Sequence, residues 1–107
     1  MIQALAGFSG TMLLRMRSFH LVNLTDEDLL QQLQSGVSDA LAVLFDRHYR
    51  VVFSVAHRIL RDSGEAEDLM QEVFLDVYRT VDRYDPARGS VKNWILGYAS
   101  HRSINRL

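Results

Sequence analysis

A chain of 107 residues with 13 acidic and 12 basic side chains is close to neutral, and 48% of its residues are hydrophobic. This composition is typical of one small folded domain, and it excludes a disordered segment and a large enzyme with separate substrate and cofactor lobes. The absence of cysteine excludes disulfides, thiol nucleophiles and thiolate metal sites, and it fits a protein of the reducing cytoplasm.

Residues 1–23 are expected to form a poorly ordered N-terminal extension. The apolar run over residues 1–14 is too short to span a bilayer, so no membrane insertion is expected. Two basic residues, Arg15 and Arg17, follow this run, whereas a secretory signal carries its positive charge before the apolar segment. We therefore place the folded helical domain at residues 24–107.

The first helix is expected between Thr25 and Gly36. Thr25 can accept hydrogen bonds from the free amides of the first turn, and the three acidic residues after it favour the positive end of the helix dipole. Gly36 can end the helix. Leu29, Leu30 and Leu33 supply an inner apolar stripe.

The second helix is expected to begin at a Ser38 cap and to continue to Arg61 as the central helix of the core. Its helical period is carried by Leu41, Leu44, Phe45, His48, Val52, Val55, Ala56 and Ile59.

The third helix is expected from Ser63, as its cap, to Val81. Its inner arc consists of Ala66, Leu69, Met70, Val73, Val77 and Val81. The opposite arc carries Asp68, Gln71, Glu72 and Leu75, with Phe74 and Tyr78 at its edge. An apolar residue surrounded by polar groups is typical of a docking face, and a solvated helix with one exposed leucine explains the pattern equally well.

A loop is expected from Asp82 to Ser90. Pro86 disfavours helix at Asp85, and Gly89 permits a positive φ angle. Ser90 can cap a last helix that continues to Leu107. No cap closes this helix, so we expect either that a longer native chain was cut here or that a second domain has been left off. The apolar members of this helix are Val91, Trp94, Ile95, Tyr98, Ala99 and Ile104.

Four helices with short connections predict an all-α fold, a compact bundle of about four helices. None of the four histidines stands four residues from another, so the spacing of a helical metal site is missing. Glu65 and Glu72 share a helix face but lack the histidine partners of a di-iron bundle. Helix capping explains Ser63 and Ser90 without catalysis. The sequence therefore predicts no enzyme, no metal and no cofactor.

The last quarter of the chain interleaves basic and aromatic residues: Arg79, Arg83, Tyr84, Arg88, Lys92, Trp94, Tyr98, Arg102 and Arg106. Cations follow a phosphate backbone and aromatic rings stack on unpaired bases, so the mixture favours single-stranded nucleic acid over a duplex groove. Trp94 and Tyr98 lie four residues apart on one helix, and packing in the core explains Trp94 at least as well.

Two runs, DLMQEVFL over residues 68–75 and YDPARGSVKNWI over residues 84–95, closely resemble region 2 of sigma-70-type initiation factors, specifically the extracytoplasmic-function (ECF) group. The resemblance covers about residues 24–107, and residues 39–49 are similar to the first conserved helix of that family. It implies a bacterial, non-enzymatic transcription initiation domain. We expect this chain to lack the helix-turn-helix domain with which the family reads the minus-thirty-five element, either as an excised domain or as an isolated region 2.

In that family, the helix similar to residues 63–81 binds the clamp helices of the largest subunit of core RNA polymerase. The resemblance therefore implies polymerase contacts at Asp68, Gln71, Glu72, Phe74 and Tyr78. Leu75 is added to this set from the helical wheel alone.

The loop and the last helix are implied to capture the non-template strand of the minus-ten promoter element as it melts, with one base flipped into a pocket beside the loop. The phosphate contacts implied are Arg83, Arg88 and Lys92, and the melting surface is Trp94 and Tyr98. Four further residues are expected at the DNA: His101, Arg102, Asn105 and Arg106. His101 and Asn105 stand where many relatives carry Asn and Asp, so the promoter sequence itself is not predicted.

An alternative is an interaction-only helical module that binds polymerase or an anti-sigma factor without opening DNA. Failure to bind single-stranded minus-ten DNA in the presence of core enzyme would favour it. An anti-sigma factor is also a candidate partner under the main interpretation.

Overall fold

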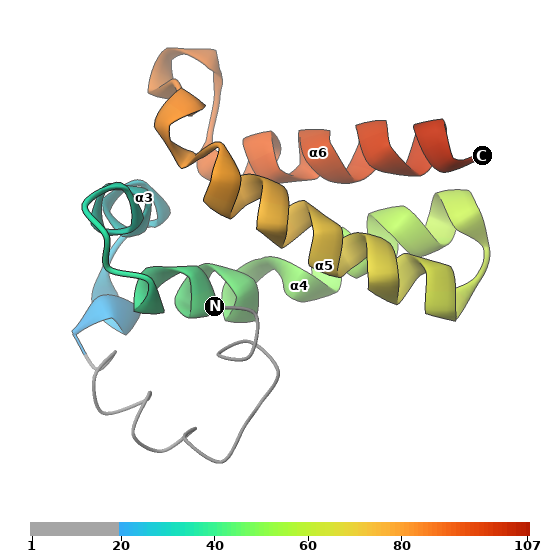
Figure 1. The fold of residues 1–107 in the computed structure, drawn as a ribbon, viewed down its shortest axis with the longest axis horizontal. Helices are drawn as coiled ribbons and strands as arrows, with labels where there is room; N and C mark the ends of the chain where they lie inside the picture. Colours follow the sequence, from blue (N-terminus) through green and yellow to red (C-terminus); the bar gives the residue numbers. More distant parts are fainter. Residues whose placement is uncertain (1–19) are drawn as a thin grey trace. The chain divides into compact units, whose positions relative to one another are not determined.

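The computed structural model describes residues 20–107, and every regular element in that range is helical (Figure 1). The α-helices of this range are α3 (Asp26–Gln34), α4 (Asp39–Leu60), α5 (Ser63–Arg79) and α6 (Val91–Arg106). Short 3-10 helices span Leu21–Asn23, Val81–Arg83 and Pro86–Arg88. The all-α class with about four helices is therefore confirmed. The chain divides into two compact units within α4, the first ending at Arg47 and the second covering His48–Leu107.

In the first unit, α3 begins as the sequence predicts. The hydroxyl oxygen of Thr25 accepts a hydrogen bond of 3.1 Å from the amide of Asp28, and the three leucines of the inner stripe are buried. Gly36, after the helix, has a φ angle of +96°, which a residue with a side chain rarely adopts. The expected start and end of this helix are thus confirmed.

The chain is already folded before Leu24. Leu21 lies in the first 3-10 helix and is 1% exposed. Arg47 holds this segment, because its guanidinium donates one hydrogen bond of 2.9 Å to the carbonyl of Val22 and another of 3.0 Å to Asp26. Of the extension expected over residues 1–23, residues 1–19 lie outside those that the structure describes.

The connection from α4 to α5 differs from the expectation. α4 ends at Leu60, and Arg61 adopts a left-handed conformation with a φ angle of +58°. Asp62, and not Ser63, caps α5, since its carboxylate accepts a hydrogen bond of 2.9 Å from the amide of Glu65. Asp62 has the extended backbone of a cap, whereas Ser63 is the first helical residue. The prediction of a Ser63 cap was therefore wrong by one position.

The core of the second unit comes from three helices and one 3-10 turn. Its buried apolar residues are Val52, Ala56, Ala66, Leu69, Met70, Val73, Phe74, Val77, Val81, Val91, Ile95 and Ala99. Phe74 is fully buried, so its expected place at the edge of the outer arc was wrong. A large ring at the boundary of the arc gains most by turning inward, since it then removes its whole apolar surface from water.

α5 and α6 pack against each other in antiparallel directions (Figure 1). Ser90 caps α6 as predicted, accepting a hydrogen bond of 3.1 Å from the amide of Asn93. Gly89 has the expected positive φ angle, +133°. Ile104, expected among the apolar members of α6, is 60% exposed, while Ser103 next to it is buried. α5 also ends at Arg79, before the predicted Val81, which lies in the following 3-10 helix.

Candidate functional site

One face of α5 is turned to solvent and makes no hydrogen bond or ion pair with any residue of the described range. We call it the α5 outer stripe, and it consists of Asp68, Gln71, Leu75 and Tyr78. Spacings of three, four and three residues place these side chains along one line of the helix. Asp68 and Gln71 are exposed, Leu75 is half-buried, and Tyr78 is 40% exposed. The stripe therefore presents one carboxylate, one amide and two apolar surfaces together.

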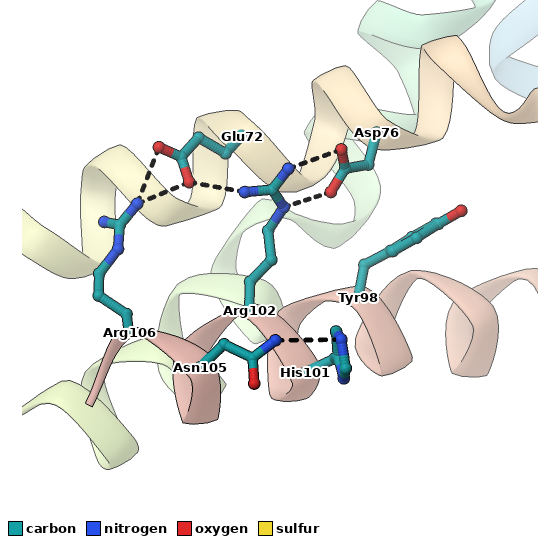
Figure 2. Close-up of a pocket in the computed structure, with 7 residues that line it drawn as sticks. All are labelled: Glu72, Asp76, Tyr98, His101, Arg102, Asn105 and Arg106. Atoms are coloured by element: carbon teal, nitrogen blue, oxygen red, sulfur yellow. Dashed lines mark hydrogen bonds and ion pairs between the residues drawn. The ribbon is translucent and has the colours of Figure 1, made fainter.

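Glu72 belongs to a different face of α5. Its carboxylate accepts hydrogen bonds of 2.6 and 2.8 Å from one nitrogen of Arg106 and one of 3.0 Å from Arg102 (Figure 2). Arg106 also lies 3.3 Å from the carboxylate of Glu65. Glu72 was expected at the polymerase contact and the two arginines at DNA, but in this structure these charges satisfy one another.

Asp76 completes this network. The guanidinium of Arg102 donates two hydrogen bonds to the carboxylate of Asp76, one from Nε and one of 2.9 Å from Nη2. The hydrogen bond to Asp76 raises the pKa of the Arg102 guanidinium above its ordinary value. One turn further on, the hydroxyl of Thr80 lies 2.5 Å from the hydroxyl of Tyr98 and donates to the carbonyl of Asp76. Tyr98, expected on the melting surface, is thus tied to α5 through its hydroxyl.

The exposed side of α6 next to this network carries His101 and Asn105. The Nδ2 atom of Asn105 lies 3.1 Å from Nε2 of His101, and both residues are exposed. Figure 2 shows these two side chains beside α6, while Arg102 and Arg106 extend towards α5. His101, Arg102, Asn105 and Arg106 border one open pocket of about 430 Å³, so its rim combines an imidazole and an amide with paired charges.

A second, smaller pocket of about 160 Å³ lies beside the loop before α6. It is lined by Arg83, Tyr84, Asp85, Arg88, Gly89, Ser90, Asn93 and Trp94. This volume is well below the roughly 300–1,000 Å³ of sites for drug-sized ligands, so the pocket suits one small planar group. We call it the loop pocket.

Local hydrogen bonds shape the loop pocket. The hydroxyl of Tyr84 donates to the carbonyl of Gly89 at 2.9 Å, which joins the two ends of the loop. The carboxylate of Asp85 accepts from the amide of Ala87 at 3.0 Å and caps the 3-10 helix. The ring of Trp94 then lies 5.4 Å from the ring of Tyr84. Contacts within the loop and with α6 therefore define the walls of the pocket.

The predicted DNA residues separate into two groups in the structure. Arg83, Arg88 and Lys92 are exposed around the loop and the start of α6, and Trp94 is half-buried with its ring between two tyrosines. Arg102 and Arg106, by contrast, are paired with carboxylates of α5. The exposed cations and Trp94 thus lie around the loop pocket, whereas Arg102 and Arg106 are bound to carboxylates of α5.

Sequence reasoning missed Asp76 and Asn93. Asp76 stands four residues after Glu72, on the same face of α5, and that spacing was the available signal. Asn93 lines the loop pocket at the position after Lys92, and no spacing rule singles it out.

Among residues 20–107, no cluster of histidine, aspartate and glutamate could hold a metal ion. No helix in the same range is both long and apolar enough to cross a membrane.

Comparison with known proteins adds the family. The family model described as Sigma-70 region 2 matches residues 44–107. The chain is 38% identical over 79 residues to the protein named ECF RNA polymerase sigma factor SigK of Mycobacterium ulcerans (strain Agy99), a match that covers 74% of this chain and 42% of that protein. It is 39% identical over 84 residues to the protein of the same name from Mycobacterium sp. (strain KMS), covering 78% of this chain and 44% of the other.

The chain therefore spans less than half the length of the curated relatives it matches. No solved structure gives a significant match. The helical fold and these matches lead to the same conclusion: the chain belongs to the sigma-70 region 2 family and is similar to sigma factors of the ECF group.

Proposed function

We propose that this chain is the part of an ECF-type sigma factor that binds core RNA polymerase and captures the melted minus-ten element of a promoter. The observation that carries the proposal is the loop pocket, a space of the size of one small planar group with Arg83, Arg88 and Trp94 in its lining. Sigma factors are initiation factors and not enzymes, which agrees with the non-enzymatic role expected from the sequence. We propose that residues 24–107 form the domain that makes both contacts, and that it acts in the cytoplasm.

The polymerase contact that we propose is the α5 outer stripe. Its carboxylate and amide can accept hydrogen bonds from a basic helix, while Leu75 and Tyr78 offer apolar surface at the centre of such a contact. Phe74 is left out because it is fully buried. The partner is the pair of clamp helices in the largest polymerase subunit.

The DNA contact that we propose is the loop pocket with the exposed cations around it. A base that leaves the stack costs a few kcal/mol, which stacking and hydrogen bonds inside a pocket can recover. Trp94 supplies an aromatic surface, Asn93 supplies amide donors and an acceptor, and Arg88 and Lys92 are placed to hold the phosphates on either side. This is binding of the non-template strand without covalent chemistry.

A pull-down by the isolated clamp-helix fragment tests the first contact. Asp68→Arg reverses the charge of the outer stripe, and Gln71→Ala removes its amide. We expect both variants to stop binding the clamp-helix fragment while they keep the helix content of the wild type. Glu67→Gln is the matched control, because Glu67 is exposed on the same helix outside the stripe. Binding of the fragment by both stripe variants at the wild-type level would disprove this contact.

Fluorescence anisotropy with a labelled non-template strand, in the presence of core polymerase, tests the second contact. Arg88→Ala and Lys92→Ala should each weaken binding and reduce the slope of log affinity against log salt by about 0.7. If the strand fails to bind even with core enzyme present, the interaction-only alternative is favoured, with polymerase or an anti-sigma factor as the partner.

A further inference from the structure

The stripe of α6 that is turned towards α5 changes its chemistry halfway along the helix. It runs through Ile95, Ala99, Arg102 and Arg106, at spacings of four, three and four residues. Ile95 and Ala99 are fully buried, whereas the two arginines continue the same stripe as cations. In the second half of α6, ion pairs from Arg102 and Arg106 are the contacts that join it to α5, beside the fully buried Ser103.

The contacts between the two helices follow an antiparallel order, which we call the α5–α6 ladder. The hydrogen bonds run in order along α6. Tyr98 is bonded to Thr80. Arg102 is bonded to Asp76 and Glu72, and Arg106 is bonded to Glu72 and Glu65. Each step forward on α6 is thus a step backward on α5. Glu72 is central, because its carboxylate is the one in the ladder that both arginines share (Figure 2).

The ladder carries no surplus of positive charge. The carboxylates of Glu65, Glu72 and Asp76 face the guanidinium groups of Arg102 and Arg106, so three negative charges meet two positive ones. A phosphate that approached either arginine would have to displace a carboxylate bound at 3.0 Å or less. Neither arginine is therefore available as a phosphate contact while the ladder is closed.

The ladder also fixes the rotation of α6. A helix turns by about 100° per residue, so His101, directly before Arg102, and Asn105, directly before Arg106, stand on a neighbouring face, where they are exposed. We propose that Glu72 is a positioning residue, which turns Arg102 and Arg106 onto α5 and thereby presents His101 and Asn105 to promoter DNA. The inference rests on the proposed function for the DNA contact, and it assigns Glu72 neither to polymerase nor to DNA.

Thermal unfolding of the chain alone tests the ladder. Glu72→Gln keeps the shape of the side chain and removes its charge, so we expect the Tm to fall by about 4–8 °C. Glu67→Gln makes the same change on an exposed part of α5 and should lower the Tm by less than about 2 °C. Arg106→Gln should also lower the Tm, and the double variant with Glu72→Gln should fall by less than the sum of the two.

Arg106→Lys should have a Tm between those of Arg106→Gln and the wild type, because lysine keeps the positive charge but lacks the planar guanidinium that donates several hydrogen bonds at once. Equal Tm values for Glu72→Gln and Glu67→Gln, or additive effects in the double variant, would overturn the proposal. This measurement needs neither polymerase nor DNA, so its result is independent of the proposed function.

A spectroscopic measurement tests the positioning itself. Well below the Tm, the side-chain amide resonance of Asn105 in an NMR spectrum should move in Glu72→Gln and stay unchanged in Glu67→Gln, since only the first change frees α6 to rotate. An Asn105 resonance that is the same in both variants would contradict the positioning role.

Salt dependence separates the ladder from the proposed function. When binding of the labelled non-template strand is measured in the presence of core polymerase, Arg106→Gln should leave the slope of log affinity against log salt unchanged, while Arg88→Gln reduces it by about 0.7. An equal reduction in both variants would make Arg106 a phosphate contact and overturn the inference. If neither variant changes the slope, the proposed DNA contact is disproved. The Tm values of the single and double variants of Glu72 and Arg106 still test whether the ladder stabilises α6.

Discussion

Replacing Phe74 by alanine distinguishes a core residue from a docking residue. Phe74 is fully buried and heads the largest completely buried side chains of the described range. Its truncation removes apolar contacts and leaves a cavity, for which losses of about 3–5 kcal/mol are typical. Folded domains are stable by only about 5–15 kcal/mol, so we expect Phe74→Ala to lose a large share of the stability and much of the folded population near physiological temperature.

Urea unfolding followed by far-ultraviolet circular dichroism measures this loss. Tyr78→Ala is the matched control, because Tyr78 lies one turn later on α5 and is 40% exposed. Its truncation should cost less than about 1 kcal/mol, in the range of surface substitutions. A loss below about 1 kcal/mol for Phe74→Ala, with loss of polymerase binding at full helix content, would refute the assignment of Phe74 to the core.

Three further predictions concern single residues. Asp62→Ala should lower the stability by about 0.5–2 kcal/mol in thermal unfolding because it removes the cap of α5, whereas Ser63→Ala should change it by less than about 0.5 kcal/mol; equal effects would contradict the cap. Arg61→Gly should raise the stability by up to about 1 kcal/mol, since glycine adopts the left-handed conformation without the steric penalty; a lower Tm would argue against this. Binding of a single-stranded oligonucleotide should change the fluorescence of Trp94, the one tryptophan of the chain, and an unchanged spectrum at saturation would exclude stacking on its ring.

The sequence was sufficient for the elements whose signals are local. Thr25, Ser90 and Gly89 act at a helix end or a turn through their own side chain or backbone, so neighbouring residues decide their roles. The same locality explains the error at Ser63. Two adjacent residues, Asp62 and Ser63, can both cap a helix, and backbone conformation selects one.

The errors on the helical wheel have a different cause. Phe74 stands at the boundary between the inner and outer arcs of α5, where a shift of one position decides between burial and exposure, whereas Ile104 lies about 180° from the buried Ile95 on α6 and was counted with the apolar members for its residue type. Periodicity leaves the burial of Phe74 undecided, and for Ile104 it predicts the exposure that the structure shows. Tertiary packing then buries Phe74 and leaves Ile104 60% exposed.

The ladder could not be predicted from local pattern. Arg102 and Arg106 stand 26 to 41 residues after their carboxylate partners, and a run of basic and aromatic residues has the same appearance whether its cations are free or paired. The outer stripe, in contrast, needed only the spacing within α5, and Asp68, Gln71 and Tyr78 lie at the surface as expected.

The change from apolar to ionic contacts along α6 gives its two halves different sensitivities to the medium. Burial of Ile95 and Ala99 is little affected by salt, whereas ion pairs at a half-exposed surface are screened once the Debye length falls to a few ångströms. Concentrated chloride should therefore raise the amide hydrogen exchange of the last two turns of α6 while the first two turns stay protected. α6 would then respond to ionic strength as two segments, although its backbone is one continuous helix.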